Sequence, residues 1–109
     1  MPVTIERSPQ GETVTARLRG EIDHHGAARI REEIDHSVLS GPARTLVLDF
    51  GEVEFMDSSG IGIVLGRYRL MQELDGSLRL QNLPPHIRKV LRLAGVDALK
   101  IMDKGGREE

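Results

Sequence analysis

One segment in the middle of the chain restricts the possible folds more than any other. Phe55 and Met56 end an apolar, strand-like run, the turn Asp57-Ser58-Ser59-Gly60 follows, and an apolar, helix-like run begins at once. A polar turn between a strand and a helix is typical of an α/β protein in which the helix starts at the end of a sheet. A hydroxyl in that turn, on Ser58 or Ser59, can serve as a helix cap, a nucleophile or a phosphorylation site.

Strand and helix patterns alternate along the rest of the chain. The spacing of apolar residues predicts the order β-β-α-β-α-β-α-β. The expected strands lie at 3–7, 13–19, 45–50, 78–80 and 98–102, and the expected helices at about 25–39, 58–74 and 84–94. The turn Ser8-Pro9-Gln10-Gly11 should join the first two strands in a hairpin, and the later alternation implies a mostly parallel sheet with helices packed on it. We therefore expect one α/β domain over 1–103 and a polar, disordered tail at 104–109.

The composition of the chain excludes several classes of function and says less about the fold. The 109 residues include no cysteine, so disulfides and thiolate metal sites are excluded. The formal net charge is −2, the basic residues are scattered, and the aromatic residues are Phe50, Phe55 and Tyr68. This composition provides neither a phosphate-binding face nor stacking platforms, which argues against direct binding to nucleic acid. The amino terminus lacks the apolar core of a signal peptide, and the apolar stretch Ile61–Leu65 is too short to cross a membrane, so we expect a cytoplasmic protein.

The turn at Asp57 is, in its simplest interpretation, an N-cap for the helix that follows. Aspartate and serine are preferred there because their oxygens accept hydrogen bonds from the free N–H groups of the first turn. A cap does not explain Gly60, Gly62 and Gly66, each of which costs a helix about 1 kcal/mol relative to alanine. Glycines at that cost suggest a backbone that must be approached closely, by the protein's own core or by a partner.

Two catalytic or cofactor-binding interpretations of this turn find less support. A nucleophilic serine in a sharp G-x-S-x-G turn would need glycine where Met56 stands. Ser58 with His24 or His25 as the base leaves a small serine hydrolase as an alternative, although no spacing rule supports it. The pattern Gly60-x-Gly62-x-x-x-Gly66 lies too deep in the helix for a dinucleotide site, and the required acidic residue does not follow. We expect neither enzymatic activity nor a cofactor of the protein's own.

A phosphorylation site fits the physics of this turn better. A phosphate at a helix N-terminus meets free N–H groups and the positive end of the helix dipole, which is worth about 0.3–1 kcal/mol. The carboxylate of Asp57 opposes it by about 1 kcal/mol at 4 Å in water, so the two contributions roughly cancel and the fold should tolerate the modification. A phosphate buried in an interface without a counter-charge costs several kcal/mol, which is enough to prevent a complex from forming.

A second polar segment, Asp23-His24-His25, precedes the first predicted helix. Its simplest interpretation is a surface loop with both imidazoles in water and His25 at the helix cap. A metal site is not predicted, because adjacent histidines rarely point the same way and the sequence has no H-x-x-x-H pair. We expect this loop to lie near the start of the Ser58 helix and to contact whatever docks there. Arg67 is expected on a solvated helix face, where it can form a salt bridge with an acidic partner.

Together these segments resemble the bacterial anti-sigma factor antagonists, the single-domain members of the STAS family. The most specific similarities are Leu18–His25, Phe55–Gly62 and Gly66-Arg67-Tyr68, and the resemblance covers nearly the whole chain. The paired histidines and Gly66-Arg67-Tyr68 look closest to the stage II sporulation anti-sigma F factor antagonists. Two departures are Gly26, where relatives often have threonine, and the short segment after Met102, which leads us to expect a closing helix that is missing or vestigial.

The resemblance implies a regulatory switch rather than an enzyme. It implies that Ser58 is phosphorylated by a partner that is both an anti-sigma factor and an ATP-dependent serine kinase, so the ATP belongs to the partner. The unphosphorylated protein, expected to be a monomer when free, would bind this partner and release its sigma factor, and a metal-dependent serine phosphatase would restore it. A scaffold subunit of a STAS-type signalling assembly is the alternative. The residues expected to contact the partner are Asp23, His24, His25, Asp57, Ser59, Gly60, Gly62 and Arg67.

Overall fold

A sheet of four strands in the order β1-β2-β3-β4 forms the centre of the computed structural model, which describes residues 2–103. The tail expected at 104–109 lies outside the described residues. The strands are β1 (Val3–Arg7), β2 (Thr13–Ile22), β3 (Thr45–Met56) and β4 (Ser77–Gln81). The helices are α1 (His24–Leu39), α2 (Ser58–Glu73) and α3 (Pro85–Leu93), followed by the short 3₁₀ helix η1 (Val96–Leu99).

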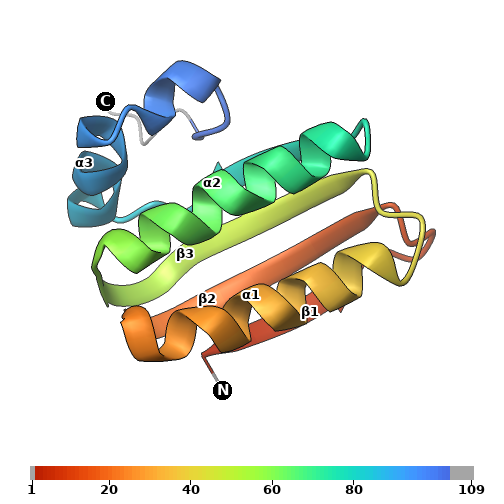
Figure 1. The fold of residues 1–109 in the computed structure, drawn as a ribbon, viewed down its shortest axis with the longest axis horizontal. Helices are drawn as coiled ribbons and strands as arrows, with labels where there is room; N and C mark the ends of the chain where they lie inside the picture. The colour runs from red at the N-terminus through yellow and green to blue at the C-terminus, as the bar shows by residue number, and fades with distance from the viewer. Residues whose placement is uncertain (1, 104–109) are drawn as a thin grey trace.

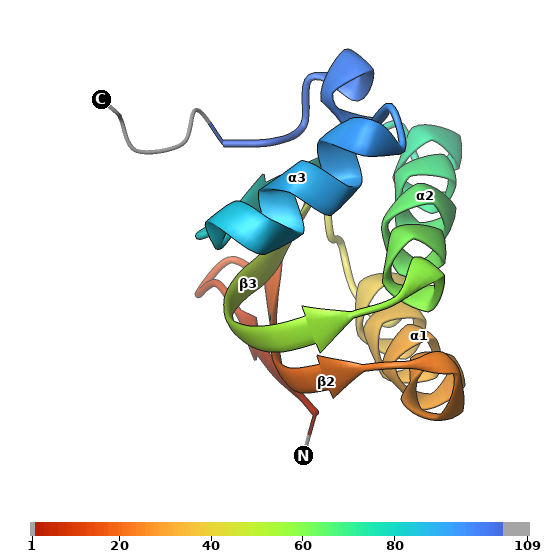
Figure 2. The ribbon, with the colours of Figure 1, turned by 90° about the vertical axis from the view of Figure 1, so that its left-hand side faces the viewer.

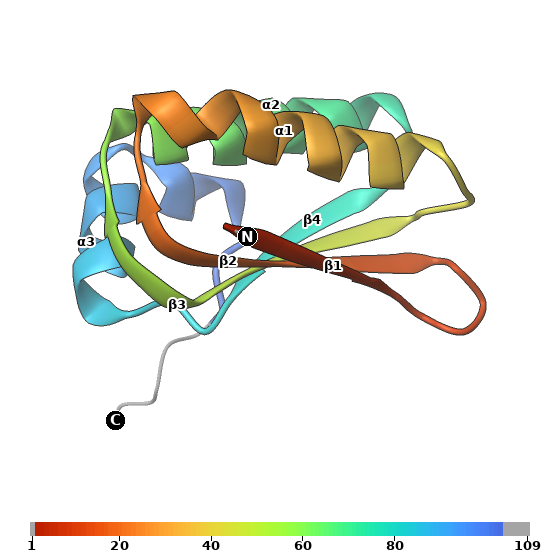
Figure 3. The same cartoon turned by 90° about the horizontal axis from the view of Figure 1, so that it is seen from below.

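The pairing of the strands confirms the predicted hairpin and the mostly parallel sheet. β1 runs antiparallel to β2, whereas β2–β3 and β3–β4 are parallel pairs. The connections between the parallel strands are α1 and α2, which lie side by side on one face of the sheet (Figure 1, Figure 3). The carboxyl ends of β2 and β3 therefore lead into two helices that begin at the same end of the sheet (Figure 2).

The hydrophobic core lies between the sheet and the two long helices. Alternate residues of β2 point into it, so that Val14 and Ala16 are fully buried, and Ile30 and Ile34 of α1 are equally buried. Burial of this kind, more than intrinsic propensity, stabilises a helix such as α2 that contains several glycines. Within the described residues, no helix has both the length and the apolar character that a membrane span requires.

The last predicted strand, at 98–102, is wrong. Residues 96–99 form η1, and within residues 2–103 the sheet continues beyond β4 only as a single parallel bridge between Leu80 and Met102. Val96 and Leu99 are three residues apart, so one 3₁₀ turn brings both to the core side, where Val96 is fully buried and Leu99 packs against the core. Lys100 then adopts a left-handed conformation (φ 59°), which interrupts the extended backbone.

Candidate functional site

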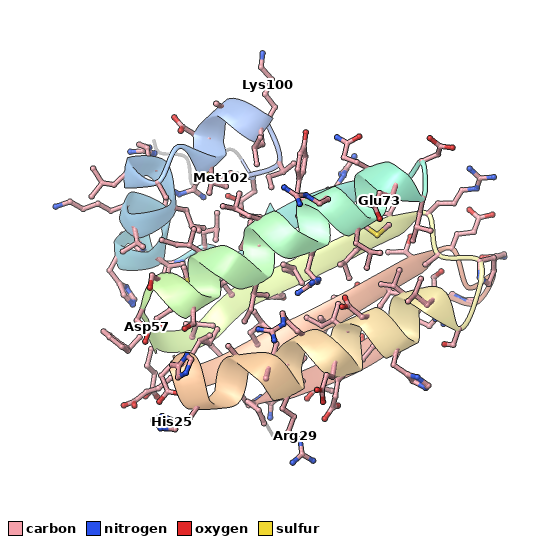
Figure 4. All side chains as sticks on the ribbon, viewed as in Figure 1. His25, Arg29, Asp57, Glu73, Lys100 and Met102 are labelled. Carbon is pink, nitrogen blue, oxygen red and sulfur yellow. The ribbon has the colours of Figure 1, made fainter. Side chains whose placement is uncertain are left out.

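The ends of β2 and β3 bring the two predicted polar segments together. Ile22 and Met56 are the last register partners of the two strands, and the Asp57 N–H donates to the Ile22 carbonyl (3.2 Å). Both strands are longer than the sequence predicts, because register shifts let the pairing continue through the expected loop. Asp23 and Asp57 each follow one of these partners, so the starts of α1 and α2 are neighbours, as the labels of His25 and Asp57 in Figure 4 show.

Ser58 is the first residue of α2 and is exposed to solvent. Asp57 precedes it as the N-cap, and its Oδ1 accepts a hydrogen bond from the Ser59 N–H (2.8 Å). The Gly60 N–H donates to the Asp57 carbonyl (2.9 Å), which closes the first turn. The hydroxyl of Ser58 forms no hydrogen bond with any residue of the described range, whereas Ser59 is half-buried beside it. Of the two serines, Ser58 therefore offers the accessible hydroxyl.

Asp23 caps α1 in the same way. Its Oδ1 accepts hydrogen bonds from the His25 N–H (3.0 Å) and the Gly26 N–H (3.1 Å), so the helix begins at His24 and the expectation of a cap at His25 is wrong. Both imidazoles are exposed, with ring centroids 6.0 Å apart in an edge-on arrangement. Neither ring is hydrogen-bonded to Ser58 in the described part of the chain, so the geometry gives no support to either histidine as a base for this serine. The same part of the chain contains no group of three His, Cys, Asp or Glu side chains that could hold a metal ion.

The glycines of α2 differ in what surrounds them. A methyl group at Gly60 would lie 2.5 Å from the Sδ of Met56, so the protein's own core occupies this space. At Gly62 and Gly66 a methyl group would meet no atom of the described residues within 4 Å. The fold therefore does not require glycine at these two positions. A bare helix backbone there suits the close approach of another molecule.

Arg67 does not lie where the sequence predicts it. Its side chain is 9% exposed, and its Nε lies 2.9 Å from Oδ1 of Asp35 in α1. This contact is an ion pair without hydrogen-bond geometry, and Nη1 has no hydrogen-bond partner among residues 2–103. Burial lowers the pKa of the Arg67 guanidinium, the charge of Asp35 raises it in part, and the charge of Arg31 lowers it further. The expectation of a solvated Arg67 is wrong, because α1 supplies an acidic neighbour within the chain.

The outer side of α2 presents a stripe of exposed residues that begins at Ser58. Gly62, Leu65 and Arg69 follow at spacings of four, three and four residues, which places all of them on one face of the helix. We call Ser58, Gly62, Leu65 and Arg69 the docking face. Leu65 is 43% exposed, and Phe55, near the end of β3, is 52% exposed. No role was predicted for Phe55, because an aromatic residue in a strand pattern is ordinarily assigned to the core.

Comparison with known proteins identifies the family. A family model described as "Mlab, STAS domain" matches residues 5–102. The chain belongs to the STAS domain family. Within it, an anti-sigma F factor antagonist of Lysinibacillus sphaericus is 41% identical over 85 residues, which are 78% of this chain and 73% of that protein.

Two solved structures of a STAS relative share both fold and sequence with this chain. The unphosphorylated form of the anti-sigma factor antagonist SpoIIAA matches with a TM-score of 0.81 at 38% identity, over 92% of this chain and 84% of that one. The phosphorylated form of SpoIIAA, a Bacillus cell fate determinant, matches with a TM-score of 0.74 at 38% identity, over 92% and 87% of the two chains. These similarities confirm both the α/β fold class and the resemblance to the anti-sigma factor antagonists.

Proposed function

We propose that this chain is an anti-sigma factor antagonist whose binding is switched off by phosphorylation of Ser58. One observation carries the proposal: the Ser58 hydroxyl is exposed, forms no hydrogen bond within the described residues, and begins a helix whose outer face is open. The similarity to relatives named as antagonists supports it, as does the existence of SpoIIAA in phosphorylated and unphosphorylated forms. These relatives support a regulatory binding protein rather than an enzyme.

The unphosphorylated protein binds its partner through the docking face and the neighbouring start of α1. Gly62 and Gly66 let the partner approach the helix backbone, since no side chain of the described residues fills the space above them. Leu65 and Phe55 add exposed apolar surface, which is the part of an interface that contributes most to affinity. The two exposed imidazoles and the capping aspartates border this surface and set its polar rim.

Phosphorylation changes the interface and not the fold. A phosphate on Ser58 gains about 0.3–1 kcal/mol from the helix N-terminus. The adjacent Asp57 carboxylate repels the phosphate by about 1 kcal/mol at 4 Å in water. The same carboxylate already accepts a hydrogen bond from the Ser59 N–H. In a complex, the same phosphate is removed from water against apolar surface without a counter-charge, at a cost of several kcal/mol. Since every 1.4 kcal/mol is about a tenfold change in affinity, one phosphate is enough to release the partner.

The partner that completes this switch is both an anti-sigma factor and a serine kinase. It supplies the ATP, the γ-phosphoryl group is transferred to Oγ of Ser58, and ADP is left. A metal-dependent serine phosphatase hydrolyses the phosphoserine and returns the protein to its binding form. In this scheme the protein acts in the cytoplasm as a monomer when free, and it needs no cofactor of its own.

Phosphorylation in vitro tests the assignment of Ser58. The protein is incubated with the anti-sigma factor kinase and ATP, and the product is mapped by mass spectrometry. We expect one phosphate on Ser58 in the wild type and in Ser59→Ala, and none in Ser58→Ala. Ser59→Ala is the matched control because it removes a hydroxyl from the same turn without removing the Asp57 cap. Undiminished incorporation into Ser58→Ala would overturn the assignment.

A further inference from the structure

The outer side of β1 receives no backbone hydrogen bond from the described residues, in contrast to the other edge of the sheet. At β4 the chain covers part of its own edge, because the Leu80 N–H donates to the Ile101 carbonyl (2.8 Å) and the Asp103 N–H donates to the Leu80 carbonyl (3.0 Å). Along β1, which forms the opposite edge in Figure 1, no backbone hydrogen bond from a described residue reaches the outer side. Such an edge presents a row of donors and acceptors to which another strand can pair.

The register with β2 identifies the groups of β1 that point outward. The Pro2 carbonyl accepts a hydrogen bond from β2 and the Ser8 N–H donates one to it, each at 2.9 Å. In an antiparallel pair the bonded positions alternate, so the even-numbered residues of β1 face β2. The N–H and C=O groups of Val3, Ile5 and Arg7 therefore point away from the sheet.

β1 lacks several of the features by which edge strands avoid pairing, although it is short and ends in the charged residues Glu6 and Arg7. Its register with β2 is continuous from Val3 to Arg7, and the strand contains no bulge, proline or lysine. Arg7 is held by its own chain, since Nη1 donates to the Gly11 carbonyl (2.8 Å) and Nη2 donates to the Ser37 carbonyl at the end of α1. Arg7 thus closes one end of the edge, and Val3 at the other end is 2% exposed, so the accessible outward groups are those of the half-buried Ile5.

A groove of about 560 Å³ lies between this edge and α1. Its apolar part is formed by Val3 and Ile5, and its wall on α1 carries Glu32 and Glu33. Among the described residues no lysine or arginine lines the groove. Arg29 neutralises Glu33 through a 3.3 Å contact between Nε and Oε2, whereas Glu32 has no ion-pair partner in the same range. The groove therefore combines open backbone groups, an apolar floor and negative charge.

We propose that β1 and this groove bind an extended segment of a partner protein. This segment has apolar residues at alternate positions and a basic residue at each end. The segment adds to β1 as a further strand, places its apolar side chains on Val3 and Ile5, and directs a basic side chain to Glu32. A second copy of this chain fits less well, because a two-fold β1–β1 pair would bring the acidic walls of both α1 helices together without a basic side chain between them. The surface lies on the far side of α1 from α2 (Figure 1), so its use does not depend on Ser58.

Titration with designed peptides tests this proposal by NMR on the ¹⁵N-labelled protein. The probe is the heptapeptide Lys-Thr-Val-Thr-Val-Thr-Lys, and its matched control has glutamate at both ends. We expect the lysine peptide to bind with a Kd below about 1 mM and to shift the amide signals of β1 and of α1 near Glu32. N-methylation of the three central amides should weaken binding at least about tenfold, because it removes the main-chain hydrogen bonds. Glu32→Lys should reduce affinity for the lysine peptide by up to about fivefold and favour the glutamate peptide.

A proline substitution supplies an independent control on the edge itself. Ile5→Pro removes an outward N–H and should fold while losing the peptide, whereas Thr4→Pro removes an N–H that faces β2 and should destabilise the sheet. Phosphorylation of Ser58 should be unchanged in Ile5→Pro, so a failure here is distinguishable from a failure of the proposed function. If Ile5→Pro does not fold, the affinity of the N-methylated peptide and the effect of Glu32→Lys on peptide binding still test the proposal. Equal binding of the N-methylated peptide, shifts confined to the docking face, or a dimer of this chain that Ile5→Pro abolishes would each overturn the proposal.

Discussion

Replacing the glycines of α2 one at a time by alanine separates the requirements of the fold from those of the docking face. Each substitution gains up to about 1 kcal/mol of helix propensity, since all three residues lie within one helix. Gly62→Ala and Gly66→Ala keep this gain, because the added methyl group meets no atom within 4 Å. In a domain of roughly this size, 1 kcal/mol raises the midpoint of thermal unfolding by about 4–8 °C.

Gly60→Ala should behave differently, although the chemical change is the same. Its methyl group would lie 2.5 Å from Sδ and 2.6 Å from Cγ of Met56, which is buried, so the methionine must move. Overpacking of this kind costs about 1–3 kcal/mol, which cancels or exceeds the gain in propensity. We therefore expect a thermal midpoint at or below that of the wild type for Gly60→Ala and above it for Gly62→Ala.

The assay measures stability and binding on the same variants. Circular dichroism gives the thermal midpoints, and calorimetric titration with the anti-sigma factor kinase gives the affinities. Gly62→Ala should be more stable than the wild type and yet bind more weakly, and Gly62→Gln should bind more weakly still, because only the partner needs the space above this residue. A Gly62→Ala protein that is destabilised, or Gly62 variants that bind as tightly as the wild type, would refute the reasoning.

Three further predictions concern the cap at Asp57, the buried ion pair and the phosphorylation site. Asp57→Ala removes the acceptor of the Ser59 N–H and should lower the free energy of unfolding in urea by about 1 kcal/mol. Asp35→Asn leaves the buried charge of Arg67 without its counter-charge and should cost about 1–3 kcal/mol, because the Asp35 side chain is itself partly exposed. The double variant Asp35→Asn/Arg67→Met should recover most of this loss in the same assay. Ser58→Asp should change the free energy of unfolding by less than about 0.5 kcal/mol while it weakens binding to the kinase in calorimetry; a large loss of stability would contradict the interface argument.

Local signals in the sequence were sufficient to predict the turn at Asp57 and the helix that it caps. The turn from Asp57 to Gly60 joins a strand pattern to a helix pattern, and the residues that form the cap are neighbours in the chain. The parallel arrangement of β2 and β3 then predicts that Asp23 lies close to this turn, as it does. Alternation along the chain was equally sufficient for the hairpin and for the parallel sheet, because each depends on residues close in sequence.

Features that depend on distant residues or on fine backbone geometry were not predictable. Arg67 was expected in solvent because arginine usually is, and only the packing of α1 against α2 brings Asp35 next to it. The segment at 98–102 is too short for its periodicity to distinguish a strand from the turn that η1 forms. The exposure of Phe55 likewise follows the register shifts between β2 and β3, which no local pattern reveals.

The central claim is that a phosphate on Ser58 abolishes binding without altering the fold. Its most direct test compares the affinity of the unmodified and the fully phosphorylated protein for the same anti-sigma factor kinase, by calorimetry in the presence of ADP. We predict at least about 100-fold weaker binding of the phosphorylated protein, which corresponds to roughly 2.7 kcal/mol, with unchanged far-UV circular dichroism and thermal midpoint. Equal affinity of the two forms, or weaker binding accompanied by loss of the folded structure, would contradict the account.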